Sequence, residues 1–192
     1  MTKNFAIRLL CTVAAVAALS ACSKSDADIA KVVKAPAHAS DIFVNLCYGT
    51  KSDLDRVKNI ATLAGWEVVN NLPAAHSGKL IGAWKVTVEG HPTVIFAAEG
   101  PDDRAGSPTT GKTMKVCGVE YLGDQEPDFV NVIAGQVDLK KIDPASLKGT
   151  LPPDTLLLSD TGEENANFQI TLMRPPFLTS HMAMALAAKI EK

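Results

Sequence analysis

The first 22 residues constrain this chain most, because their pattern decides which part of it folds and in which compartment. Lys3 and Arg8 precede Leu9–Leu19, an uncharged and mostly apolar run that ends in small residues. The run is shorter than the about 20 residues that a helix needs to span a bilayer. It has the length of the apolar part of a secretory signal. We therefore predict that residues 1–21 are a signal peptide and that the rest is exported.

The end of this segment, Leu19-Ser20-Ala21-Cys22, resembles the lipobox of bacterial lipoprotein precursors. The resemblance implies that Cys22 carries a diacylglycerol on its sulfur and, after cleavage, an acyl chain on its amine. Two or more acyl chains hold a protein firmly on a membrane. Ser23, rather than Asp, follows the cysteine, which by the same resemblance implies the outer membrane, with the protein facing the periplasm. The alternative is an ordinary signal peptide with a chance cysteine.

The composition of the remaining chain fits one mildly acidic domain. Removing residues 1–21 from the 192 leaves 171 residues, with 17 basic and 21 acidic side chains. No concentrated basic patch points to nucleic acid, so we expect no nucleic-acid partner. Residues 22–40 are small and polar, which predicts a lipidated N-terminus and flexible tether, with a short helix over 27–34 as an alternative. We place a single domain at 41–192, a usual size.

Two of the four cysteines are expected to meet in the fold. Cys11 leaves with the signal peptide and Cys22 is lipidated, which leaves Cys47 and Cys117. An even pair in an oxidising compartment favours a disulfide. Two buried free thiols are the alternative. A redox pair is disfavoured because the chain has no C-x-x-C motif.

Hydrophobic periodicity predicts an α+β domain. Ser52 is predicted to cap the N-terminus of a helix. The apolar stripe of this helix is followed by Gly65, a residue typical of helix C-termini, and consists of Leu54, Val57, Ile60, Ala61 and Ala64. Gly90 marks a hairpin turn. The predicted order is β-α-β-β-β-α-β-β-α, an antiparallel sheet with helices packed mainly on one face. The predicted strands are 41–49, 79–89, 93–99, 113–122, 155–160 and 167–174, and the helices are 52–64, about 126–137 and 179–192.

Part of this layout resembles small exported proteobacterial proteins of unknown function. The shared features lie within residues 41–122: Cys47 ending the first predicted strand, Gly65-Trp66 ending a helix, Trp84 in a strand, and Cys117 with Val119 two residues on. The resemblance implies the fold and the disulfide. It implies no activity.

The stretch 106–113, GSPTTGKT, matches the phosphate-loop pattern G-x-x-x-x-G-K-[ST]. A phosphate loop needs a strand ending at its first glycine and a helix starting at its lysine. Here residues 101–105 separate the preceding strand from Gly106, and an alternating β-branched stretch follows Thr113. Asp102 and Asp103 would also repel a triphosphate. We predict a hairpin loop and no nucleotide.

No other motif indicates catalysis or a metal. No two of His38, His76, His91 and His181 have the i, i+4 spacing of a zinc-binding helix, and the chain lacks G-x-S-x-G. We therefore expect no metal, no cofactor and no catalytic residues. Trp66 and Trp84 are the candidate ligand-binding residues, although filling the core is their more common role.

These observations predict a lipid-anchored protein of the cell envelope. Its expected role is that of an accessory or binding module that acts through protein contacts. The alternatives are a periplasmic small-molecule binder that uses Trp66 and Trp84, and a hydrolase without a recognisable motif.

Overall fold

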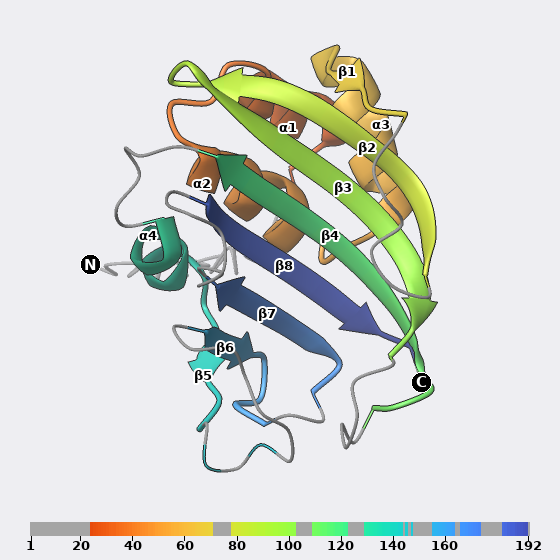
Figure 1. The fold of residues 1–192 in the computed structure, drawn as a ribbon, viewed down its shortest axis with the longest axis vertical. Coiled ribbons are helices and arrows are strands. Elements are labelled where there is room, and N and C mark those ends of the chain that lie inside the picture. Colours follow the sequence, from red (N-terminus) through yellow and green to blue (C-terminus); the bar gives the residue numbers. More distant parts are fainter. Residues whose placement is uncertain are drawn as a thin grey trace, which may run out of the picture.

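The computed structural model describes residues 24–70, 78–102, 109–122, 129–143, 145, 147, 155–163, 166–173 and 182–191. These residues form helices and one antiparallel sheet, which confirms the α+β class (Figure 1). The signal segment and Cys22 lie outside them. The helices are α1 (Asp26–Lys34), α2 (Ala39–Ile42), the π-helix η1 (Phe43–Tyr48), α3 (Leu54–Ala64) and α4 (Phe129–Gln136). The strands are β1 (Glu67–Val68), β2 (Lys79–Val88), β3 (His91–Pro101), β4 (Thr113–Leu122), β5 (Lys140–Lys141), β6 (Leu156–Ser159), β7 (Phe168–Met173) and β8 (Met182–Ile190).

The sheet has the order β1-β2-β3-β4-β8-β7-β6-β5, and every neighbouring pair is antiparallel. Two groups of consecutive strands, β1 to β4 and β5 to β7, are therefore joined by β8. Strand β8 pairs with β4 along one edge and with β7 along the other. The last described strand thus lies in the middle of the sheet.

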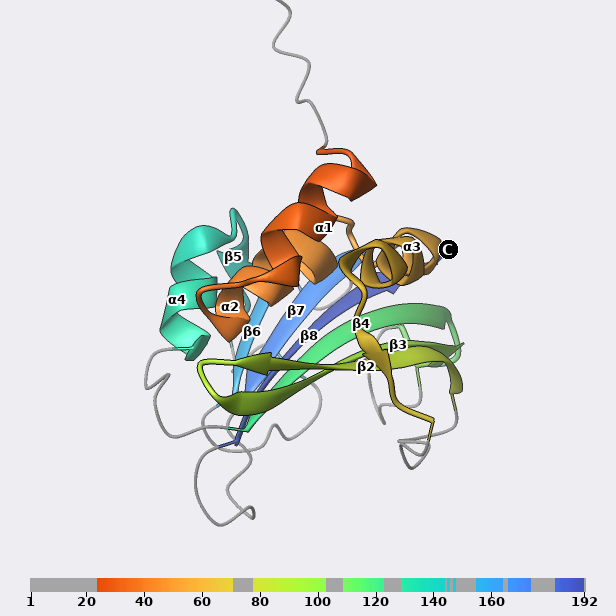
Figure 2. The same ribbon diagram turned by 90° about the horizontal axis from the view of Figure 1, so that it is seen from above.

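The described helices lie on one side of the sheet, as Figure 2 shows. Helices α2, η1 and α3 contact the central strands, whereas α1 packs mainly on α3 and η1 and forms the outermost layer. Between helices and sheet lies the hydrophobic core, because one face of each strand points at the helices. We call the opposite side of the sheet the open face, because no described helix or strand covers it (Figure 1).

Helix α3 follows the prediction closely. Its buried residues are the predicted apolar stripe, and Gly65 ends it with φ 72°, in the left-handed region that glycine adopts without strain. The cap differs: the side chain of Asp53, not Ser52, accepts the N–H of Arg56 at 3.2 Å. The Ser52 hydroxyl instead donates to the carbonyl of Ala187 at 2.7 Å. The hairpin at Gly90, the strand holding Cys117, α4 and the two strands near 156–173 are also confirmed.

The predicted strand at 41–49 is wrong, because α2 and η1 occupy this segment. Its fully buried residues are Ile42, Phe43, Leu46 and Cys47. Their spacing of one, three and one residues places them on one side of a helix. The carboxylate of Asp41 accepts the N–H of His38 at 3.0 Å and helps to start the helix.

The predicted C-terminal helix is also wrong, since residues 182–190 form β8. High alanine content favours a helix in isolation. Here Ala183, Ala185 and Ala187 alternate towards the core and are almost fully buried beneath the helical layer. Pairing on both edges with β4 and β7 outweighs the local preference.

The predicted domain boundary at residue 41 is too late. Residues 26–34 form α1, in which Ile29, Ala30 and Val33 are at most 5% exposed and belong to the main core. Since α1 packs on α3 and η1, residues 24–40 are part of the folded unit rather than a flexible tether.

Candidate functional site

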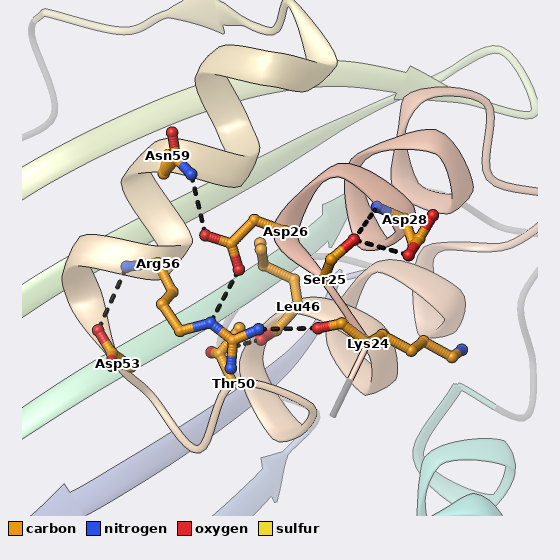
Figure 3. Close-up of polar contacts among 9 residues, drawn as sticks. All are labelled: Lys24, Ser25, Asp26, Asp28, Leu46, Thr50, Asp53, Arg56 and Asn59. Atoms are coloured by element: carbon orange, nitrogen blue, oxygen red, sulfur yellow. Dashed lines mark hydrogen bonds and ion pairs between the residues drawn. The ribbon is translucent and has the colours of Figure 1, made fainter. Parts of the chain in front are cut away.

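The described chain is fixed in place from Lys24 onward, close behind the predicted lipidation site. Figure 3 shows the contacts that hold it. The guanidinium Nε of Arg56 lies 2.8 Å from Oδ1 of Asp26, and the amide of Asn59 donates to Oδ2 at 2.9 Å. Nη2 of Arg56 also donates to the carbonyl of Lys24 at 3.0 Å. We call Lys24, Asp26, Arg56 and Asn59 the clamp.

The electrostatics of the clamp favour the ionised carboxylate. The hydrogen bond from Asn59, supported by the hydrogen bond and charge of Arg56, lowers the pKa of Asp26 below its ordinary value. Ser25 then caps α1 by accepting the N–H of Asp28 at 3.2 Å. The amine of Lys24 donates to the side chain of Asn45 in η1 at 3.0 Å. The segment after the predicted anchor is therefore bound to both α3 and η1.

The predicted disulfide between Cys47 and Cys117 is present, with Cα atoms 5.3 Å apart. Cys47 comes from η1 and Cys117 from β4, and both side chains are fully buried. The bond therefore ties the helical layer to the middle of the sheet. Closing a loop over a separation of 70 residues stabilises the fold by about 4 kcal/mol on the chain-entropy model.

The two tryptophans lie in the core. Trp66 is 9% exposed and Trp84 is 4% exposed, and both belong to the main hydrophobic cluster. The indole N–H of Trp66 is buried and has no hydrogen-bond acceptor among the described residues. Both rings therefore contribute to the packing of the core.

The described end of the phosphate-loop-like stretch forms the turn of a hairpin. The N–H of Gly111 donates to the carbonyl of Asp102 at 2.8 Å, and the N–H of Asp102 donates to the carbonyl of Lys112 at 2.8 Å. The buried hydroxyl of Thr109 also donates to the carboxylate of Asp102. Strand β4 starts at Thr113, which confirms that a strand follows the lysine. A phosphate loop has a helix at this point, so the local structure after Lys112 differs from that of a phosphate loop. Residues 103–108 lie outside the described chain.

The two histidines that the structure describes, His38 and His91, each have a different partner. Nδ1 of His38 lies 3.3 Å from the carboxylate of Glu89, and His91 packs edge-on against Tyr121. His76 and His181 fall outside the described residues. Across the described ranges, no three metal-ligating side chains gather, and no helix is long and apolar enough to span a bilayer.

The open face of the sheet is the feature that the sequence analysis missed. Strand pairing brings together four rows of side chains on it, since alternate residues of each strand share a face. Most are apolar, and most are only partly buried. They include Val94, Phe96, Ala98, Val116, Met184, Leu186, Ala188 and Met173.

The centre of the open face is continuous. Gly118 lies between Phe96 and Leu186, which pair with it on either side. A Cβ placed on Gly118 would be 2.5 Å from Cε1 of Phe96 and 2.8 Å from Cδ2 of Leu186. The two side chains therefore close over the glycine and make one apolar surface across three strands.

One ionisable group, Glu120, lies within this apolar surface. Strand register places it between Val94 and Met184, with Lys85 one strand beyond Val94. Burial raises the pKa of the Glu120 carboxyl above its ordinary value. A carboxylate that has lost part of its hydration gains from a cation supplied by a binding partner.

A signal for this face exists in the sequence. Antiparallel strands with one solvated face alternate apolar and polar residues. The segments TVIFAA in β3 and MAMALAA in β8 are instead apolar on both faces.

Comparison with protein-family models, with curated proteins and with solved structures finds nothing that matches this chain, so its function has to be inferred from its own residues.

Proposed function

We propose that this protein is a lipid-anchored component of the cell envelope that binds another protein through the open face of its sheet. The anchor is supported by the lipobox-like residues up to Cys22. The binding role is supported by one observation above all: a continuous apolar surface that no described helix or strand covers. Extended apolar patches of this kind mark interaction sites on folded proteins.

The chemistry of the open face defines the partner. Its centre, around Phe96 and Leu186, requires an apolar surface of matching shape. Glu120, partly desolvated among apolar neighbours, favours a lysine or arginine of the partner opposite it. The proposed partner is therefore an apolar protein surface that carries a basic side chain.

The two alternative functions have less support. A small-molecule site at Trp66 and Trp84 requires accessible rings, and both are buried. A hydrolase requires a nucleophile and a base within hydrogen-bond reach. Three serines of the described chain use their hydroxyl groups in structural hydrogen bonds: Ser25 and Ser159 accept nearby N–H groups, and Ser52 donates to the carbonyl of Ala187.

Membrane attachment is tested first, because the rest of the proposal depends on it. Cys22→Ser should move the protein from the membrane fraction to the soluble fraction of its own cells. The mass of the N-terminal peptide should show acyl chains on Cys22 in the parent protein. An unmodified Cys22 in a membrane-free protein would refute the anchor.

Partner binding is tested by photo-crosslinking in intact cells. A photoreactive residue at Met184, on the open face, should give a covalent adduct with a second protein, and one at Leu63, on the exposed side of α3, should not. Leu186→Glu should abolish the Met184 adduct, because it places a charge in the apolar centre. Glu120→Gln should weaken the adduct while leaving the melting temperature unlowered. Crosslinks only within the chain would show that another part of the protein covers this face.

A further inference from the structure

The distance from the predicted anchor to the folded unit is very short. Only Ser23 separates Cys22 from Lys24, the first residue of the clamp. Two Cα steps span at most about 7 Å. Because Lys24 is hydrogen-bonded to Arg56 of the clamp and also to Asn45, the acylated cysteine would stay close to this part of the surface.

The clamp lies on the side of the molecule remote from the open face. Asp26, at the start of α1, belongs to the outermost helix, and α3 and η1 lie between α1 and the sheet (Figure 2). Packed helices are about 8–10 Å apart, axis to axis. The helices α3 and η1 and the sheet itself therefore lie between the anchor and the open face.

The surface around the clamp has the chemistry of a lipid-facing patch. Lys31 is 79% exposed, and Val32 beside it is 41% exposed. On α3, Leu63 is 51% exposed and Lys58 is also exposed. Two exposed acids offset part of the positive charge: Asp28, whose carboxylate lies 3.5 Å from the amine of Lys31, and Asp55 on α3. Lysines within a Debye length of a bilayer, about 8–10 Å, are attracted to anionic head groups.

We propose that the exposed sides of α1 and α3, here called the outer helical surface, lie against the lipid head groups, and that the open face points away from the membrane. This inference rests on the proposed acylation of Cys22. It adds an orientation: the anchor does not simply hold the domain near the membrane but presents one defined face of the sheet to the compartment beyond it.

Site-specific fluorescence quenching tests this orientation. The full-length acylated protein is purified and reconstituted into vesicles of phosphatidylethanolamine and phosphatidylglycerol that contain a lipid with a nitroxide on its head group. One fluorophore is attached at Lys31→Cys on the outer helical surface, and in a second protein at Lys85→Cys on the open face. Both native positions are exposed. Cys47 and Cys117 are blocked by their disulfide. Quenching should be several-fold stronger at position 31 than at position 85.

A linker variant provides the matched control. Inserting about 20 glycine and serine residues between Ser23 and Lys24 gives the anchor an r.m.s. span of about 25 Å. Quenching at the two positions should then become similar, while membrane attachment persists. Equal quenching in the parent protein, with acylated Cys22 shown by mass, would overturn the orientation and leave the anchor intact. An unacylated Cys22 would overturn the anchor and, with it, this inference.

Discussion

At the residue scale, replacing glycine by alanine is expected to have opposite effects on stability at Gly118 on β4 and at Gly135 on α4. A side chain at Gly118 would collide with Phe96 and Leu186, whereas nothing lies within 4 Å of a Cβ added to Gly135. Gly118→Ala should destabilise the protein by about 1–3 kcal/mol through overpacking. Gly135→Ala should stabilise it by about 0.5–1 kcal/mol through helix propensity. Urea unfolding of both variants checks the pair, and a neutral Gly118→Ala would show that Phe96 does not rest on the glycine.

The clamp predicts a specific pH dependence. Because Asn59 and Arg56 lower the pKa of Asp26 in the folded state, its carboxylate stabilises the fold above its unfolded pKa of about 3.9. That stability is lost as the pH falls through the lowered folded pKa. Asp26→Asn should therefore reduce the free energy of unfolding by about 1 kcal/mol at pH 7, a value discounted for partial exposure.

The measurement is thermal unfolding of Asp26→Asn and the parent protein from pH 7 down to pH 2. The difference between their melting temperatures should shrink at the acidic end. Glu67→Gln, at an exposed carboxylate on β1, serves as the control and should show a smaller difference throughout. If the melting temperature of Asp26→Asn stays below that of the parent protein by the same amount at every pH, the charge of the carboxylate is not what holds α1 to α3.

At the scale of elements, α1 is expected to stabilise the whole fold. Val33 is fully buried and Val32, its neighbour, is 41% exposed. Val33→Ala should cost about 1–3 kcal/mol, because it removes two buried methyl groups and leaves a cavity. Val32→Ala should change the stability by less than about 0.5 kcal/mol. Equal, small effects in urea unfolding would show that α1 is the dispensable tether that composition suggests.

The elements also show how far the sequence determines this fold. Helix α3 is predictable because its stripe, Gly65 and the acidic first turn all agree. The segments 41–49 and 182–190 are not, for different reasons. In the first, a short apolar run fits helix and strand alike. In the second, alanines with high helix propensity form a strand only because β4 and β7 lie on both sides of it.

The disulfide, the open face and the clamp also differ in how far the sequence predicts them. The pairing of Cys47 with Cys117 is predicted from the number of cysteines and from the expected compartment, and the structure confirms the disulfide itself. The sequence of β3 and β8 indicates strands that are apolar on both faces, but it does not show which residues meet on the open face. Phe96, Gly118 and Leu186 come from three strands, and only the strand order makes them neighbours. The clamp depends in the same way on α1, which the sequence predicts only as an alternative to a flexible tether.

At the scale of the whole molecule, β8 is expected to be indispensable. Without it, β1–β4 and β5–β7 share no hydrogen-bonded edge. A chain ending at Met173 should therefore lose cooperative unfolding, and its amides in β4 and β7 should lose protection from hydrogen exchange. A chain ending at Glu191 keeps β8 and the 2.6 Å contact between Glu191 and Lys115, and should behave like the parent protein. Cooperative unfolding of the shorter chain would contradict this.

The central position of β8 also sets the timing of folding. A chain that leaves the ribosome, or a pore, with its N-terminus first releases both halves of the sheet before the strand that joins them. Until β8 is available, the facing edges of β4 and β7 have unpaired N–H and C=O groups. Such edges can aggregate or bind a chaperone. Residues 182–190 can close the sheet only after they have emerged, so the native sheet is completed last at its centre.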